Sequence, residues 1–211
     1  MKLIRTANAG VLLELDGKKI LIDGVCREVK PYPATPEHIK AKLLEELPDA
    51  VAFTHSHKDH YDPVFAVEYL QKGGVILGPA DCHGIMEPAV VGNVRITPIP
   101  SRHMGPAGKT AQHVGFWIEG SQRILFSGDS APGQWQRLDL PTPDVMIVPY
   151  IYANTSYAWD ATRKFGAKKI VLLHLPARQE DTLDLWHAVD ATVGECDELL
   201  IPEIGENITV L

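Results

Sequence analysis

The run THSHKDHYD places three histidines and two aspartates within eight residues. It follows directly on a short apolar run, DAVAFT (49–54), which has the length and composition of a buried strand. In an extended loop the side chains at positions i and i+2 point the same way, so His55 and His57 can contact one ion together. Asp59 and His60, a little further along the loop, then face a point next to that ion. Imidazole nitrogen and carboxylate oxygen bind zinc, and also iron or manganese, so the run predicts a metal-binding loop at a strand end.

Apolar runs with strand spacing alternate with segments of helical spacing along the rest of the chain. Predicted strands lie in a hairpin at 10–24, at 49–54, 74–78 and 94–100, in a second hairpin at 114–129, at 144–149 and 168–174, and in two short runs near the C-terminus. Predicted helices lie at 35–47, at 62–73, near 155–165 and near 180–191, with Thr35 expected to cap the first. This alternation predicts an α/β protein.

The second hairpin repeats features of the first. Gly10 aligns with Gly115, and Asp23 aligns with Asp129 after a slip of one residue. Two related β/α halves packed sheet against sheet would explain this, and a chance similarity between amphipathic hairpins is the alternative. The chain of 211 residues carries no linker or low-complexity segment, so we expect one domain over residues 1–211.

Charge and composition limit the classes of partner that this chain is expected to bind. The chain has 20 Lys and Arg against 27 Asp and Glu, a formal net charge of -7, and no basic run. This balance disfavours nucleic acid and membrane surfaces and leaves a small-molecule substrate as the expected partner. The three cysteines are isolated, which indicates a reducing compartment. No apolar run has the length of a membrane span or the pattern of a signal peptide, so we expect a cytoplasmic protein.

Three further residues of metal-ligand type follow predicted strands. His103 comes after ITPIPS, Asp129 after ILFSG, and His174 at the end of IVLLH. Strand ends on one edge of a sheet converge in space, so these residues can meet the loop that carries His55 and His60. The remaining histidines lack this placement, although His113, at the start of a strand, is a candidate pocket residue.

The run THSHKDHYD resembles the H-x-H-x-D-H signature of the metallo-β-lactamase superfamily. ILIDG resembles the aspartate of the first motif in that family, and SRH, SGDS and LLHL follow in the order of its remaining motifs. DHYD and the hairpin GFWIE…ILFSGDS are most similar to the small UlaG-like metal-dependent hydrolases. The resemblance implies a four-layer αββα sandwich, in which two mixed β-sheets are flanked by helices, with a two-metal site on one edge.

The resemblance also implies a role for each ligand. One metal would be bound by His55, His57 and His103, the second by Asp59, His60 and His174, with Asp129 bridging the two. Zinc is favoured by ligand type, with manganese or iron as alternatives. Two cations about 3.5–4 Å apart can share a water and lower its pKa to about 7, and the resulting hydroxide attacks a carbonyl or phosphoryl centre. Asp59 would also orient the nucleophile and pass a proton toward the leaving group.

Supporting and substrate-binding residues are also predicted. Asp23 or Asp62 is expected to accept the second N–H of a metal-binding imidazole and to fix its tautomer. Residues near the predicted centre could contact substrate, with packing or plain surface charge as the alternative for each. These candidates are Arg102 and Lys109 for an acidic group, together with His113, Tyr150, Tyr152 and Asn154.

Three functional classes are compatible with these features. The favoured class is a binuclear metal-dependent hydrolase of a small ester, lactone or phosphoester. A phosphodiesterase acting on nucleotides or nucleic acid is disfavoured by the acidic charge balance. A non-hydrolytic metal-binding or redox protein is the third class. Redox relatives in the superfamily replace the second histidine of the signature with glutamate and attach a flavin-binding domain, whereas His57 is histidine and no second domain is expected here.

Overall fold

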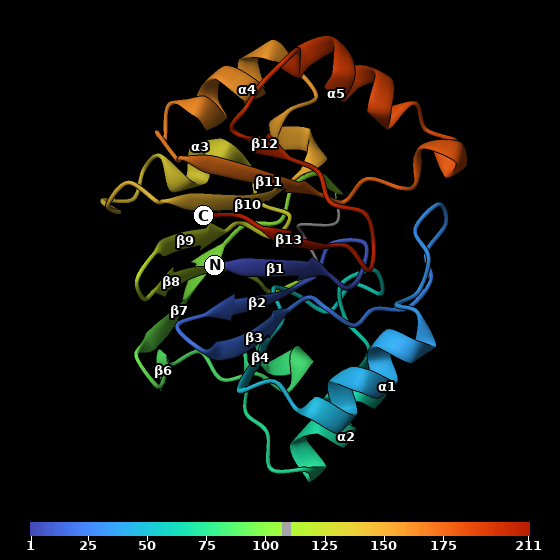
Figure 1. Ribbon diagram of the computed structural model, residues 1–211, viewed down its shortest axis with the longest axis vertical. Helices are drawn as coiled ribbons and strands as arrows, with labels where there is room; N and C mark the ends of the chain where they lie inside the picture. The colour runs from blue at the N-terminus through green and yellow to red at the C-terminus, as the bar shows by residue number, and fades with distance from the viewer. Residues whose placement is uncertain (107–110) are drawn as a thin grey trace.

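Two β-sheets lie face to face in the computed structural model, which describes residues 1–106 and 111–211 (Figure 1). The first sheet has the order β13-β1-β2-β3-β4-β5 and the second the order β12-β11-β10-β9-β8-β7-β6. The strands of the first sheet are β1 (Lys2–Arg5), β2 (Val11–Leu15), β3 (Lys18–Ile22), β4 (Ala50–Ala52), β5 (Ile76–Leu77) and β13 (Asn207–Thr209). Those of the second are β6 (Ala89–Val91), β7 (Val94–Ser101), β8 (His113–Glu119), β9 (Arg123–Phe126), β10 (Val145–Pro149), β11 (Lys169–Leu173) and β12 (Leu199–Leu200).

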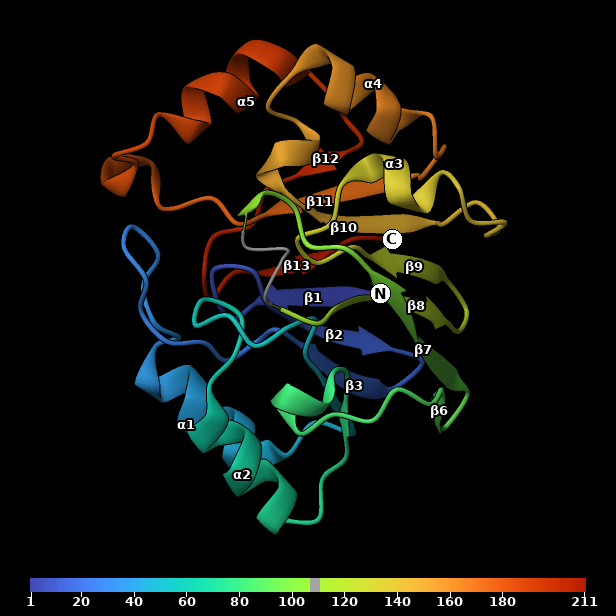
Figure 2. The same ribbon diagram turned by 180° about the vertical axis from the view of Figure 1, so that it is seen from behind.

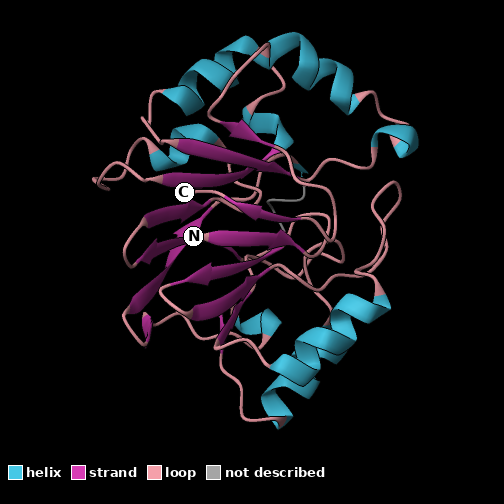
Figure 3. Cartoon of the chain, viewed as in Figure 1, coloured by secondary structure: helices cyan, strands magenta, loops and turns pink. Residues whose placement is uncertain are grey.

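Helices cover the outer face of each sheet (Figures 1 and 3). The first sheet is covered by α1 (Glu37–Glu46) and α2 (Pro63–Gln71), and the second by α3 (Pro132–Trp135), α4 (Ser156–Arg163) and α5 (Leu185–Val193). Figure 2 shows the same four layers from behind. Short 3₁₀ turns are η1 (Ala80–Cys82), η3 (Tyr150–Tyr152) and η4 (Arg178–Glu180). The two mixed sheets between helices are the predicted αββα sandwich.

The central strands are buried on both faces, since each sheet lies between the other sheet and a layer of helices. Successive side chains point to opposite sides of a sheet, so alternate residues of one strand belong to different cores. In β10, Val145 and Ile147 belong to the core between the two sheets. Met146 and Val148, the alternate residues, belong to the core under α3, α4 and α5. A fully apolar strand of this kind fits between two layers, which is why the run at 144–149 lacks an alternating polar face.

The two sheets share one pairing pattern, as the repeated hairpin predicts. Strands β1 to β5 pair antiparallel, antiparallel, parallel and parallel, and strands β7 to β11 do the same. In the first hairpin Asp16 and Gly17 both have positive φ, as a two-residue turn of this kind requires. The matched glycines allow close approach: a Cβ on Gly10 would lie 1.9 Å from the carbonyl oxygen of Asp23.

The boundaries differ from expectation in several places. Thr35 does not cap α1, because its hydroxyl accepts from the backbone N–H of Cys26 at 2.9 Å and the helix begins after Pro36. Helix α5 begins later than the pattern near 180–191 predicts, because the carboxylate of Asp181 accepts from two backbone N–H groups and holds a turn there. The elements β1, β6 and α3 were not anticipated from the sequence. Within the described residues, no helix is both long and apolar enough to cross a membrane.

Candidate metal centre

The C-terminal ends of β3, β4, β7, β9 and β11 lie at one edge of the sandwich, on the right in Figure 1. The loop after β4 carries the histidine cluster, and it closes in a turn in which the N–H groups of His60 and Tyr61 donate to the carbonyl of His57. His103, Asp129 and His174 lie just beyond the ends of β7, β9 and β11. The structure thus brings to one edge all seven residues predicted as ligands.

Three histidines form the first cluster. The ligand atoms of His55, His57 and His103 lie within 4.8 Å of one another. Their rings face one another edge-on, with centroid separations of 4.4 Å for His55 and His57 and 4.7 Å for His57 and His103. His55 is fully buried, and this burial lowers its pKa well below the usual value, which keeps it in the neutral form that binds metal.

A second cluster joins Asp59, His60 and His174, whose ligand atoms also lie within 4.8 Å of one another. His174 follows β11 with a φ of 65°, a left-handed conformation that turns the chain at the strand end. Its Nε2 atom lies 3.3 Å from Oδ2 of Asp59. Burial opposes ionisation of Asp59, but the adjacent His174 and His60 outweigh it and lower the pKa of the carboxyl to about 2.

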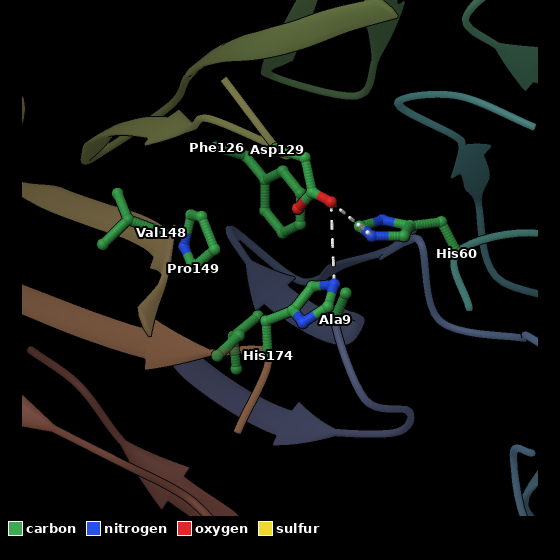
Figure 4. A pocket seen from close by; sticks show the side chains of 9 residues that line it. Ala9, His60, Phe126, Asp129, Val148, Pro149 and His174 are labelled. Carbon is green, nitrogen blue, oxygen red and sulfur yellow. Dashed lines mark ion pairs between the residues drawn. The ribbon is translucent and has the colours of Figure 1, made fainter. Parts of the chain in front are cut away.

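Asp129 lies between the two clusters. Its Oδ2 atom is 3.3 Å from Nε2 of His60, 3.4 Å from Nε2 of His103 and 3.6 Å from Nε2 of His174. Figure 4 shows this carboxylate facing His60 and His174. Burial alone would raise the pKa of Asp129, but the surrounding imidazoles hold it well below its usual range. One carboxylate oxygen therefore reaches residues of both clusters.

The chemistry of these atoms fits divalent metal ions. Five buried imidazole nitrogens in the described residues make no hydrogen bond. They are the Nε2 atoms of His55, His60, His103 and His174 and the Nδ1 atom of His174. A buried polar atom without a partner is unfavourable, and each of these atoms belongs to a histidine of the two clusters. Nitrogen and carboxylate ligands at such spacing suit zinc, and also manganese or iron.

Neighbouring groups fix the opposite nitrogen of three imidazoles. Nδ1 of His60 lies 2.8 Å from Oδ2 of Asp23, and Nδ1 of His103 lies 2.6 Å from the carbonyl oxygen of the following residue. Nδ1 of His55 lies 2.9 Å from the hydroxyl of Thr54. Such contacts leave Nε2 facing the cluster and set the ring orientation. Thr54, the residue just before the first histidine, was not singled out from the sequence.

Asp23 and Asp62 have different positions. Asp23 is fully buried and accepts from the N–H and hydroxyl of Thr54 at 2.7 and 2.6 Å, besides its contact with His60. Asp62 contacts no imidazole in the described structure. Its carboxylate caps α2 by accepting from the N–H of Val64 and pairs with Lys40 at 2.7 Å, so the expectation that it fixes an imidazole is wrong.

Of the residues predicted to bind substrate, some lie near the candidate metal centre and others do not. Tyr150 is half-buried, and its ring centroid lies 6.3 Å from that of His174. Tyr152 is completely buried in the core beneath α4 and has no exposed surface to offer a substrate, which corrects its assignment. Asn154 is half-buried just before α4, and Arg102 is exposed next to His103. Lys109 lies outside the described residues.

His113 is also placed differently from expectation. It is buried, and both of its ring nitrogens already have partners: the hydroxyl of Ser101 at 2.7 Å and the backbone N–H of Asp129 at 2.9 Å. Burial lowers its pKa to about 3. A ring with both nitrogens occupied by protein groups has none to offer a substrate, so the prediction of a substrate contact is wrong.

Tyr32 borders the centre without having been anticipated. Its ring meets that of His174 edge-on at a centroid separation of 4.6 Å, and it is largely buried. Tyr32 lies on the long loop between β3 and α1, in the run KPYP. No periodicity in this Pro-rich run indicates the contact, which depends on how the loop folds back over the strand ends.

The chain resembles known proteins in sequence. The family described as "Beta-lactamase superfamily domain" matches residues 18–193. A hydroxyacylglutathione hydrolase from Xanthomonas euvesicatoria is 29% identical over 122 residues. That match covers 56% of this chain and 44% of the relative, so the chain spans less than half of the relative's length.

Solved structures share the fold. A protein described as a possible metal-dependent hydrolase from Veillonella parvula matches with a TM-score of 0.71 and 19% identity, over 99% of each chain. An isothiocyanate hydrolase from Delia radicum gut bacteria matches with a TM-score of 0.62 and 18% identity, also over 99% of each chain. Both comparisons place the two-sheet sandwich among structures of the same architecture.

Proposed function

This chain belongs to the metallo-β-lactamase superfamily, and we propose that it is a binuclear metal-dependent hydrolase of small substrates with a scissile carbonyl. One observation carries the proposal: Oδ2 of Asp129 lies within 3.6 Å of His60, His103 and His174, which belong to two separate three-residue clusters. A carboxylate oxygen close to both ligand clusters suits a pair of neighbouring cations.

The two clusters would hold one ion each. His55, His57 and His103 would bind the first, and Asp59, His60 and His174 the second, with Asp129 common to both. Two divalent ions there, with zinc favoured by the donor set, would lower the pKa of a shared water to about 7 and polarise the scissile carbonyl. The buried floor under Asp129, formed by Phe126, Val148 and Leu173, lowers the local dielectric and strengthens these interactions.

The protein groups around the centre then have separate tasks. Asp59 is only partly exposed and is ionised over the working pH range, so it can orient the attacking water and carry its proton toward the leaving group. Asp23 holds the ring of His60 through Nδ1. Tyr32 and Tyr150 flank His174 and form a wall on the substrate side.

A thioester is the favoured substrate, with an ester or lactone as close chemical relatives. The similarity to a hydroxyacylglutathione hydrolase supports this class, because the relative's name describes cleavage of an acyl–sulfur bond.

A paired assay tests this function. Metal-free protein reloaded with zinc or manganese is offered a small acyl thioester, a lactone and a chromogenic phosphodiester, with Asp59→Ala as the inactive variant and Asp62→Asn as the matched control. We expect metal-dependent cleavage of a carbonyl substrate that is lost in Asp59→Ala and kept in Asp62→Asn. Cleavage of the phosphodiester alone would overturn the substrate class. Loaded protein that cleaves none of the three would contradict the hydrolase proposal.

A further inference from the structure

His113 is buried beneath the candidate metal centre but is neither Asp129 nor a member of the two ligand clusters. It is the first residue of β8, and its ring centroid lies 5.1 Å from that of His55 and 5.6 Å from that of His103. A histidine this close to a metal centre could be an unused ligand or plain packing. Its hydrogen bonds point to a third role.

The hydrogen bonds define the tautomer of His113. The backbone N–H of Asp129 can only donate, so Nε2 of His113 is the acceptor of that bond, at 2.9 Å. Nδ1 must then carry the hydrogen of the neutral ring and donates it to the hydroxyl oxygen of Ser101, at 2.7 Å. The ring is therefore fixed at both nitrogens in one orientation.

These contacts hold the peptide of Asp129 from one side, and the loop of His103 holds it from the other. The carbonyl of Asp129 accepts from the backbone N–H of Met104 at 2.8 Å. Gly128, just before it, has a φ of 52°, and a Cβ there would lie 2.7 Å from Nε2 of His113. The turn that presents Asp129 therefore packs closely against the imidazole, at a position where only glycine fits.

Ser101 extends the connection to another ligand. It pairs directly with His113 across β7 and β8, two positions before His103. The chain of contacts Ser101–His113–Asp129 therefore ties the end of β7, where one metal ligand lies, to the turn after β9, where the shared carboxylate lies.

We infer that His113 is a positioning residue, which sets the carboxylate of Asp129 at the point where both metal clusters reach it, while Ser101 fixes the orientation of the ring. The inference rests on the proposed binuclear centre. Metal–ligand distances tolerate only about 0.2 Å of change, so a shift of the Asp129 peptide would break the sharing before it disrupts the fold. Loss of the acceptor should therefore weaken one of the two ions selectively.

Two substitutions at the same position separate positioning from packing. The side-chain oxygen of His113→Gln can reach the place of Nε2 and accept from Asp129, whereas that of His113→Asn reaches only the place of Nδ1. His187→Asn, on the exposed surface of α5, is the control for loss of a histidine. Zinc affinity is measured by chelator competition and metal content by mass spectrometry, with circular dichroism as a check of the fold. Electron paramagnetic resonance of manganese-loaded protein reports whether two ions are exchange-coupled.

We expect wild type, His113→Gln and His187→Asn to hold two ions and to give a coupled manganese signal. His113→Asn should bind the weaker ion about 10- to 100-fold less tightly and give the signal of isolated Mn²⁺. Ser101→Ala, which keeps the acceptor but frees the ring, should show a smaller loss and serves if His113→Asn does not fold. Unchanged affinity and coupling in His113→Asn, or in Ser101→Ala where that variant replaces it, would overturn the inference. Wild type without two ions would instead overturn the proposed function.

Discussion

Nδ1 of His60 lies 2.8 Å from Oδ2 of Asp23, a carboxylate that is completely buried and that also accepts two hydrogen bonds from Thr54. Burial raises the pKa of Asp23, and the three donors, which favour its charged form, offset this only in part. The pair directs Nε2 of His60 toward the cluster that contains Asp59 and His174. A residue at the end of β3 therefore controls a ligand that follows β4.

Replacing Asp23 with asparagine should weaken metal binding without removing a ligand. Asp23→Asn keeps the shape of the side chain but loses the charge that favours an N–H on Nδ1 of His60, so zinc affinity should fall about 10- to 100-fold. Competition with a fluorescent chelator measures this, with Asp62→Asn as the matched carboxylate control. Equal affinities for wild type and Asp23→Asn would contradict the role given to Asp23.

Asp62 should instead affect stability in a pH-dependent way. Burial raises its pKa, but Lys40 and the N–H groups at the start of α2 outweigh this and hold the pKa below its usual value. A depressed folded pKa means that the ionised group stabilises the protein above the unfolded pKa of about 3.9, and that this contribution is lost as the pH falls through the folded value.

Asp62→Asn keeps a residue that caps helices well but loses the ion pair with Lys40. At pH 7 the variant should be less stable than wild type by about 1–2 kcal/mol, and the difference should shrink below about pH 4. Urea unfolding of metal-free protein at several pH values measures it. A difference that grows as the pH falls would show that the pKa is shifted in the other direction.

Gly115 should not tolerate a side chain. A Cβ there would lie 2.4 Å from the ring of Trp135 and 2.7 Å from the carbonyl oxygen of Phe126. Gly115→Ala should therefore destabilise the protein by about 1–3 kcal/mol through overpacking. Gly133 in α3 has no atom within 4 Å of such a Cβ, so Gly133→Ala is the control and should be neutral or slightly stabilising. Thermal or urea unfolding compares the three proteins, and equal stabilities would refute the close contact.

Zinc should stabilise the folded protein. An ion that binds only the native state adds about 2.7 kcal/mol at a concentration of 100 times its Kd, which corresponds to a Tm increase of roughly 5–10 °C for a chain of this size. Magnesium prefers oxygen ligands and should raise the Tm much less. Calorimetry of chelator-treated protein with each ion makes the comparison, and Asp129→Ala should reduce the zinc effect. An equal response to both ions would argue against a nitrogen-rich site.

The sequence was sufficient for the features that depend on local spacing and on strand ends. His55 and His57 are brought together by the two-residue period of an extended loop, and His103, Asp129 and His174 by their positions after strands. The duplicated hairpin indicated two equivalent sheets. Each of these features follows from a repeat or a boundary that is visible in the chain itself.

The errors have two sources, a local capping pattern that was assigned another role and side chains whose surroundings are set by distant parts of the chain. Asp62 stands directly before a proline and a helix, a pattern typical of a cap, and the capping role accounts for it better than an imidazole contact does. Tyr152 and His113 lie in segments of the sequence close to predicted metal ligands or strand ends, but the folded chain buries both side chains inside the protein. Tyr32 reaches His174 through a loop without periodicity, so only the folded chain shows that contact.

The most direct test of the binuclear centre is a crystal structure of zinc-loaded protein, with anomalous data recorded on either side of the zinc absorption edge. We expect two anomalous peaks about 3.5–4 Å apart, one beside His55, His57 and His103 and one beside Asp59, His60 and His174, with a carboxylate oxygen of Asp129 contacting both. A single peak, or two peaks of which neither contacts Asp129, would contradict it.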